Sequence, residues 1–117
     1  MNDDLFLSEQ HARSRRWAVV EEDAHTAWLY LTDPESAKPV ASCWLYNCTV
    51  SEPSKRPPAT SVSFRWSPSG EAVAIFFGAD LIGFIAGRSG YSRHLEIAGP
   101  LGSPLDSDLY ASEFGEA

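Results

Sequence analysis

The sequence predicts a mainly β domain of six to seven antiparallel strands, a meander arranged as a sandwich or a partial barrel, with short terminal helical segments. Three observations predict it. Short runs rich in Val, Ile, Thr, Trp, Tyr and Phe recur between residues 17 and 87. Gly, Pro, Asp and Ser, which favour turns, stand between these runs. Apolar and polar side chains alternate over residues 61–66, as in a strand with one buried face.

The length of 117 residues is enough for one domain and too short for two ordinary ones. Hydrophobic residues make up 44% of the chain, so a real core is possible. We divide the single domain 1–117 into an N-terminal lead-in over 1–16, a β-rich core over 17–98, and a C-terminal loop with a short helix over 99–117.

The lead-in is polar, and Ser8 is placed to cap a short helix that ends near Arg13. Arg13, Arg15 and Arg16 form its basic cluster. Two interpretations stay open for these arginines. They are either a solvated approach to the first strand or an arm that contacts another molecule.

The core predicts strands at 17–22, 26–32, 40–48, 61–66, 72–77 and 81–86, with a seventh over 91–98. Asp33 and Pro34 begin a turn between the second and third strands, and residues 51–60, with three prolines, form a loop. Residues 72–77 are apolar on both faces, which indicates a central strand. Gly83 indicates a bulge or a close approach of two backbones.

The C-terminal helix is expected within residues 105–114. Leu105, Leu109 and Phe114 would share its apolar side, while Asp106, Asp108 and Glu113 would face water. The residues expected in the core of the domain are Trp17, Val19, Leu29, Leu31, Val62, Phe64, Trp66, Ile75 and Phe84.

The net charge of −7 argues against general nucleic-acid binding, because phosphates would be repelled. It permits a basic protein partner, although solubility alone explains it equally well. No apolar run approaches the roughly 20 residues of a membrane-spanning helix. The N-terminus is acidic where a signal peptide would be basic, so we expect a cytoplasmic protein with no membrane partner.

The two cysteines, Cys43 and Cys48, lie five positions apart on one expected strand. An odd spacing places them on opposite faces, so a disulfide between them is geometrically poor. They form no Cys-Xaa-Xaa-Cys pair, and no His stands at zinc-finger spacing. We expect two free thiols, no metal and no cofactor.

The densest polar group is Glu21, Glu22 and Asp23 with His25, at the tip of the first expected hairpin. Adjacent strand residues face opposite sides, so Glu21 and Glu22 cannot both serve one site. An acid–base pair or a hard-metal site remains an alternative. The favoured interpretations are a solvated hairpin tip or a contact with a protein partner.

A second candidate cluster contains Tyr91, Arg93 and His94 after the flexible Gly90. Arg93 could hold a carboxylate with two hydrogen bonds, and Tyr91 could stack on a ligand. The structural alternative pairs Arg93 with an acidic residue of a neighbouring strand and packs Tyr91 at the edge of the core. No Gly-Xaa-Ser-Xaa-Gly element is present to activate Ser92, so catalysis is the less favoured interpretation.

Several elements in this order resemble a family of small bacterial domains of unknown function. They are Trp17 to Asp23, then Thr26, Trp28 and Tyr30, then Leu45-Tyr46-Asn47, Trp66-Ser67-Pro68-Ser69-Gly70 and Gly90-Tyr91-Ser92-Arg93. The chain departs from the family at the first hairpin, where Ala24-His25 replace an Asp-Gly turn. The resemblance spans residues 17–93 and implies a compact β-rich bacterial protein, but no reaction. Small acidic domains of this kind are often suspected of being immunity or accessory proteins.

Three functions are compatible with the sequence. The favoured one is a small acidic protein-binding module of the immunity or antitoxin kind, and a flat aromatic patch with an acidic rim would support it. A small-molecule-binding protein or enzyme with a pocket near Tyr91, Arg93 and His94 would need convergent polar groups. A homo-oligomeric structural protein would need a two-fold self-contact.

Overall fold

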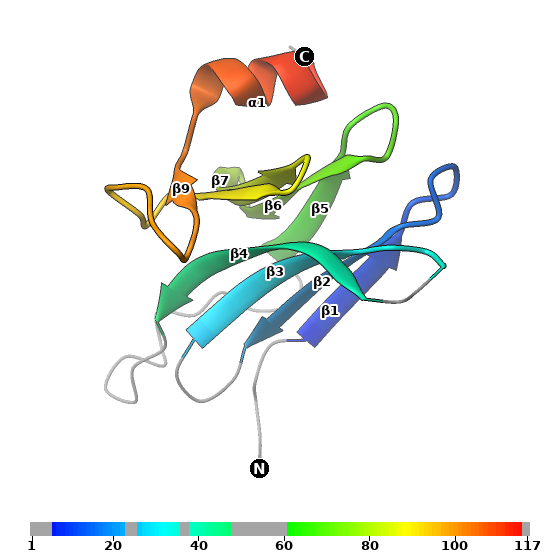
Figure 1. The fold of residues 1–117 in the computed structure, drawn as a ribbon, viewed down its shortest axis with the longest axis horizontal. Helices are drawn as coiled ribbons and strands as arrows, with labels where there is room; N and C mark the ends of the chain where they lie inside the picture. The colour runs from blue at the N-terminus through cyan, green and yellow to red at the C-terminus, as the bar shows by residue number, and fades with distance from the viewer. Residues whose placement is uncertain (1–5, 23–25, 36–37, 48–60, 116–117) are drawn as a thin grey trace.

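The structure, a computed structural model, describes residues 6–22, 26–35, 38–47 and 61–115. In chain order its elements are β1 (Phe6–Gln10), β2 (Trp17–Glu22), β3 (Thr26–Thr32), β4 (Pro39–Asn47), β5 (Val62–Trp66), β6 (Ala72–Phe77), β7 (Asp80–Ala86), β8 (Ser89–Ser92), β9 (Ser103–Pro104) and α1 (Ser107–Phe114). They form three layers. Helix α1 lies on one face of the sheet made by β5 to β9, and the sheet made by β1 to β4 lies on the opposite face of that sheet (Figure 1).

The strands form two sheets, which confirms a mainly β fold. The first sheet has the order β1-β2-β3-β4, and every neighbouring pair is antiparallel. The second sheet has the order β5-β6-β7-β8-β9, with a short parallel pairing between its last two strands. The sheets pack as a sandwich rather than a closed barrel.

The core lies between the two sheets and is built by alternate residues of each strand. In β3 the inward residues Ala27, Leu29 and Leu31 are fully buried, while the residues between them are partly exposed. From the second sheet, Val73, Ile75 and Ile85 meet them. The first four residues of β6 are all buried, as the apolar sequence of this central strand predicts.

Gly83 lies both at a bulge and at a close approach of neighbouring strands, the two features that the sequence indicated. The pairing of β6 with β7 shifts register between Ile75 and Phe76, opposite this glycine. A Cβ atom on Gly83 would lie 2.9 Å from Leu45 Cδ2 and 3.0 Å from the carbonyl oxygen of Tyr91. The absence of a side chain therefore lets β4 and β8 approach β7 closely.

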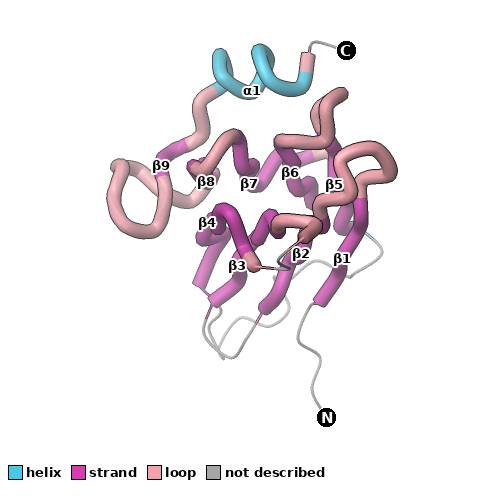
Figure 2. The backbone as a smooth tube through the Cα atoms, turned by 45° about the vertical axis from the view of Figure 1, so that its right-hand side comes forward, coloured by secondary structure: helices cyan, strands magenta, loops and turns pink. Residues whose placement is uncertain are grey.

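Helix α1 covers the outer face of the second sheet, as Figure 2 also shows. The Asp106 side chain caps it by accepting a hydrogen bond from the backbone of Leu109 at 3.0 Å. Phe114 is buried against Phe84, with ring centroids 5.8 Å apart. The predicted helix is confirmed, but this face of the sheet is covered, whereas the alternation in 61–66 had indicated a solvated one.

The contacts of Arg65 explain why the outward face of β5, expected in water, is covered by α1. It points away from the core, as predicted, yet it lies under the helix rather than in water. Its guanidinium donates to the hydroxyl of Tyr110 at 2.9 Å and to the carbonyl oxygen of Phe114 at 3.1 Å. It also lies over the Tyr110 ring, 5.7 Å from the centroid.

Two predictions about the N-terminal segment were wrong. Residues 6–10 form strand β1 rather than a helix capped by Ser8, because pairing with β2 places Leu7 opposite Val20 at the core. Trp17 is 42% exposed rather than buried, because Ala18 and Val20 of the same strand take the inward positions. The seventh strand expected over 91–98 was also wrong for most of its length, since β8 covers Ser89–Ser92 and residues 93–98 form no strand.

Candidate functional site

Several aromatic side chains lie on the outer face of the first sheet. Strand pairing places Phe6 opposite Glu21, Glu21 opposite Trp28, and Trp28 opposite Trp44. These four residues form one row across all four strands, in which Phe6 and Glu21 are exposed, Trp28 is half-buried and Trp44 is buried. The neighbouring row contains Ser8, Val19, Tyr30 and Ser42. Residues that lie opposite one another on one face of a sheet have Cβ atoms about 5 Å apart, so each row is a continuous surface.

Exposure confirms that this face points away from the core. Phe6 is 61% exposed and Trp17 42%, whereas their inward neighbours Leu7 and Ala18 pack in the core. The rings of Trp28 and Tyr30 lie 6.3 Å apart and nearly parallel, at 12°. Within the described part of the chain, no helix or strand lies over this side of the first sheet (Figures 1 and 2). We call Phe6, Trp17, Val19, Glu21, Trp28 and Tyr30 the aromatic face.

Glu21 is the one charged residue of the aromatic face. It is exposed, and it lies between Phe6 and Trp28 in the row. Among the residues that the structure describes, its carboxylate has no hydrogen-bond or ion-pair partner. The other outward residues of the four strands, so far as they are described, carry no Lys or Arg.

Glu22 has a different place from its neighbour, as the alternation of strand residues predicts. It points into the sandwich, where it is only 3% exposed, and it accepts a hydrogen bond from the Tyr46 hydroxyl at 2.7 Å. The interpretation of an exposed acidic tip therefore holds for Glu21 and is wrong for Glu22. The other two members of that cluster, Asp23 and His25, lie outside the described residues.

In the cluster of Tyr91, Arg93 and His94, the structure has the alternative in which Tyr91 packs at the edge of the core and Arg93 pairs with an acidic residue. The Tyr91 ring stacks on Phe84, with centroids 4.8 Å apart at an angle of 17°. Arg93 lies 4.0 Å from the carboxylate of Asp80, and both side chains are largely exposed. His94 is exposed beside them. Neither of the two cavities described below is lined by these residues.

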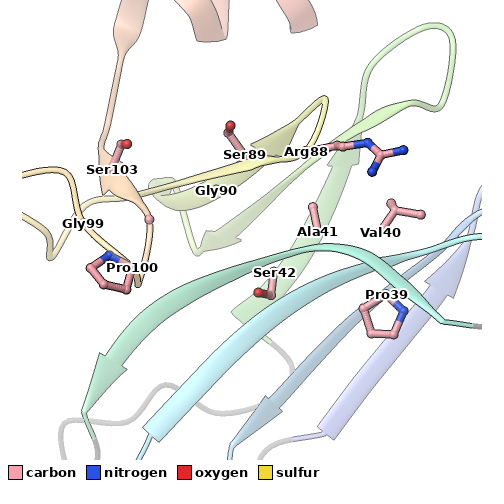
Figure 3. A pocket seen from close by; sticks show the side chains of 11 residues that line it. Pro39, Val40, Ala41, Ser42, Arg88, Ser89, Gly90, Gly99, Pro100 and Ser103 are labelled. Atoms are coloured by element: carbon pink, nitrogen blue, oxygen red, sulfur yellow. The ribbon is translucent and has the colours of Figure 1, made fainter.

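A cavity of about 450 Å³ opens between β4 and the turn from β7 to β8. Ser42, Ser89 and Ser103 line it, but Figure 3 shows their hydroxyls pointing in different directions and the Arg88 guanidinium pointing away from all three. A second cavity of about 360 Å³ shares Val40 and Arg88 with the first, and Gly87 and charged side chains of both signs form the rest of its lining. The polar groups of the first cavity do not converge on one ligand atom, as a binding pocket requires.

The thiol of Cys43 is free and buried. Its Sγ atom lies 3.3 Å from the carbonyl oxygen of Tyr91, to which it can donate. Burial raises the pKa of this thiol from 9.0 to about 12, so the nucleophilic thiolate is absent at neutral pH. The second cysteine, Cys48, lies outside the described residues.

The described residues place no three His, Cys, Asp or Glu side chains where they could hold a metal ion. Their one helix is too short and too polar to cross a membrane. Comparisons with family models, curated proteins and solved structures find no match for this chain. The resemblance to small bacterial domains therefore stays a hypothesis, and the geometry of the surface carries the functional argument.

The sequence analysis identified Glu21 but missed its aromatic neighbours. It placed Trp17 and Val19 in the core, because large apolar residues are usually buried. The periodicity of β2 could not have corrected this, because the alternate set Ala18, Val20 and Glu22 has the same pattern of two apolar residues and a glutamate. Phe6 was missed because its segment was expected to be helical.

Proposed function

We propose that this protein is a binding module that engages a basic protein partner through the aromatic face of its first sheet. One observation carries the proposal. Phe6 and Trp28 lie on the outer face of the first sheet on either side of Glu21, whose carboxylate has no partner among the described residues. An aromatic sheet face supports a binding module over a pocket enzyme, although the single carboxylate lies within the row rather than around its rim.

The composition of the face supports a protein partner. Trp, Tyr and Phe are enriched at protein interfaces, and they provide much of the binding energy when an interface closes over them. Large exposed apolar patches on soluble proteins mark such contacts. Phe6 and Trp17 are two of the four large hydrophobic residues that are strongly exposed in the described chain. If Phe6 and Trp17 had no binding partner, their exposed side chains would add nothing to the stability of the fold.

The charge of the molecule supports a basic partner. A net charge of −7 attracts a positively charged surface and repels nucleic acid, although aromatic rings on a sheet can also stack on bases. In keeping with the bacterial resemblance, a cytoplasmic immunity or antitoxin role toward a basic toxin is the specific form of this proposal. Association with a second copy of the chain is the alternative that the same surface allows.

The test compares three forms of the full chain as bait in an extract of the native host. The first is wild type, and the second is the double variant Phe6→Ser, Trp17→Ser. The third is Ile97→Ser, Leu101→Ser, which removes two other strongly exposed hydrophobic residues outside the aromatic face. We expect one protein to bind wild type and the control, and to bind the face variant at least tenfold more weakly.

Hydrogen exchange of the purified complex then locates the contact. Protection of β1, β2 and β3 is the expected result. The proposal fails if no host protein binds wild type, if the face variant binds as wild type does, or if protection lies elsewhere. Sedimentation of the protein alone separates the self-association alternative, since a dimer that the face variant abolishes would assign this surface to a second copy.

A further inference from the structure

In the row Phe6–Glu21–Trp28, an exposed carboxylate lies between two aromatic residues of the neighbouring strands, and we call these three residues the slot. Neighbouring strands lie about 4.8 Å apart, so the two aromatic residues, separated by one strand, stand roughly 9.6 Å apart with Glu21 between them. A planar group held between two rings needs roughly 7–8 Å, twice the usual contact distance of carbon atoms. The strand spacing of a regular sheet therefore leaves room for one flat side chain above the carboxylate.

The chemistry of the slot selects positive charge. A carboxylate attracts a cation directly, and the faces of aromatic rings attract it through their quadrupoles. Glu21 has no described partner for its charge, and no other charged residue faces outward from the described strands of this sheet. Both kinds of group in the slot thus favour the same ligand.

Arginine fits this arrangement better than lysine does. Its guanidinium is planar, so it can lie between two rings and still donate two hydrogen bonds from its edge to a carboxylate. The lysine ammonium is a compact, strongly hydrated charge that cannot stack. We propose that the slot formed by Phe6, Glu21 and Trp28 binds an arginine side chain of the protein partner. This inference rests on the proposed function and names the group that the partner supplies.

The test uses short peptides, so it does not depend on knowing the partner. Acetyl-Gly-Arg-Gly-amide is titrated into the ¹⁵N-labelled full chain, and the indole N–H signals are followed by NMR. The signal of Trp28 should shift and saturate at millimolar peptide. The signal of Trp66 serves as an internal reference, because its indole donates to Glu9 at 2.8 Å and lies away from the aromatic face.

Two matched controls make the result specific. The same peptide with citrulline, which has the shape of arginine without its charge, should produce no saturable shift. Glu21→Gln should weaken binding of the arginine peptide about tenfold, because charge-assisted hydrogen bonds are lost. Glu71→Gln, which alters an exposed carboxylate in a turn of the second sheet, should leave binding within about twofold of wild type.

The outcomes separate this inference from the proposed function. Equal shifts with citrulline, or an affinity that Glu21→Gln does not change, would overturn the arginine slot. If the host partner still needed Phe6 and Trp17, the binding function would stand without it. If the partner's contact mapped elsewhere while the peptide still bound at Glu21, the slot would remain and the proposed docking face would fail.

Discussion

The carboxylate of Glu22 accepts a 2.7 Å hydrogen bond from the hydroxyl of Tyr46 inside the sandwich, while the adjacent Glu21 is exposed on the other side of the same strand. One residue of the pair thus contributes to the fold, and the other is available for binding. The two neighbouring acidic residues can therefore be tested separately.

Replacing Glu22 or its partner should destabilise the protein, and replacing Glu21 should not. A buried hydrogen bond to a charged group contributes about 1.5–3 kcal/mol, so Tyr46→Phe should lower the free energy of unfolding by about that amount. Glu21→Ser should change it by less than about 0.5 kcal/mol, as expected at an exposed position. Urea unfolding measures both. Equal effects of the two substitutions would contradict the opposite placement.

Arg65→Met should loosen α1 without unfolding the sandwich. The substitution keeps the length of the side chain but removes the hydrogen bonds to Tyr110 and Phe114. Amide exchange in Ser107–Phe114 should accelerate at least tenfold, while exchange in β3 stays slow. Arg93→Met is the matched control, because its 4.0 Å ion pair with Asp80 is exposed and contributes little. Unchanged exchange in α1 would show that apolar packing alone holds the helix.

Phe84→Ala should cost more stability than Phe64→Ala. Phe84 is fully buried between the second sheet and α1, so its truncation should cost about 3–5 kcal/mol. Phe64 packs against the core but stays partly exposed, so its cost should fall below that range. Denaturant unfolding of the two variants gives the comparison, and the reverse order would contradict the burial of Phe84 under the helix.

Gly90→Ala should prevent the close approach of β4 and β8. The added Cβ atom would lie 2.6 Å from the carbonyl oxygen of Ser42 and 2.6 Å from Cys43 Cβ, so backbone must move. Overpacking of this kind costs about 1–3 kcal/mol or more. Gly99→Ala is the control, since nothing lies within 4 Å of its Cβ position. A thermal melt that gives the same midpoint for both variants would contradict the contact between the two sheets at this edge.

The thiol of Cys43 should make stability depend on pH in the alkaline range. Its pKa is about 12 in the folded protein and 9.0 as the ordinary value. Below about pH 9 both states hold the proton and stability is complete. Above pH 9 the unfolded state loses the proton first, so stability falls, by about 1.4 kcal/mol per pH unit until the folded thiol also titrates.

The measurement uses Cys48→Ser as the background, so that Cys43 is the one remaining thiol. Unfolding free energies at pH 8 and pH 10 should differ by about 1.4 kcal/mol more in this background than when Cys43→Ala is added. A thiol reagent should react with Cys43 only after denaturant is added. Rapid reaction in the native protein at pH 8 would contradict its burial.

The sequence by itself determined where most elements begin and end. Strands β2, β3 and β6 lie at the predicted residues, and α1 lies within the predicted segment. These limits are local properties. The preference of branched and aromatic residues for strands, the turn-forming Asp33 and Pro34, and the capping Asp106 act over a few neighbouring residues and need no distant contact.

Only the tertiary structure decided which face of each strand is buried, and with it the candidate site. In β2, both alternate sets contain an apolar pair and a glutamate, so periodicity alone cannot choose between them. Pairing with β1 and β3 turns the small residues Ala18 and Val20 toward the second sheet, where facing side chains must fit within about 10 Å. Trp17 and Glu21 therefore lie on the outer face. Phe6 lies beside Glu21 because residues 6–10, which alone could form a helix, gain more stability by pairing with β2 as a strand.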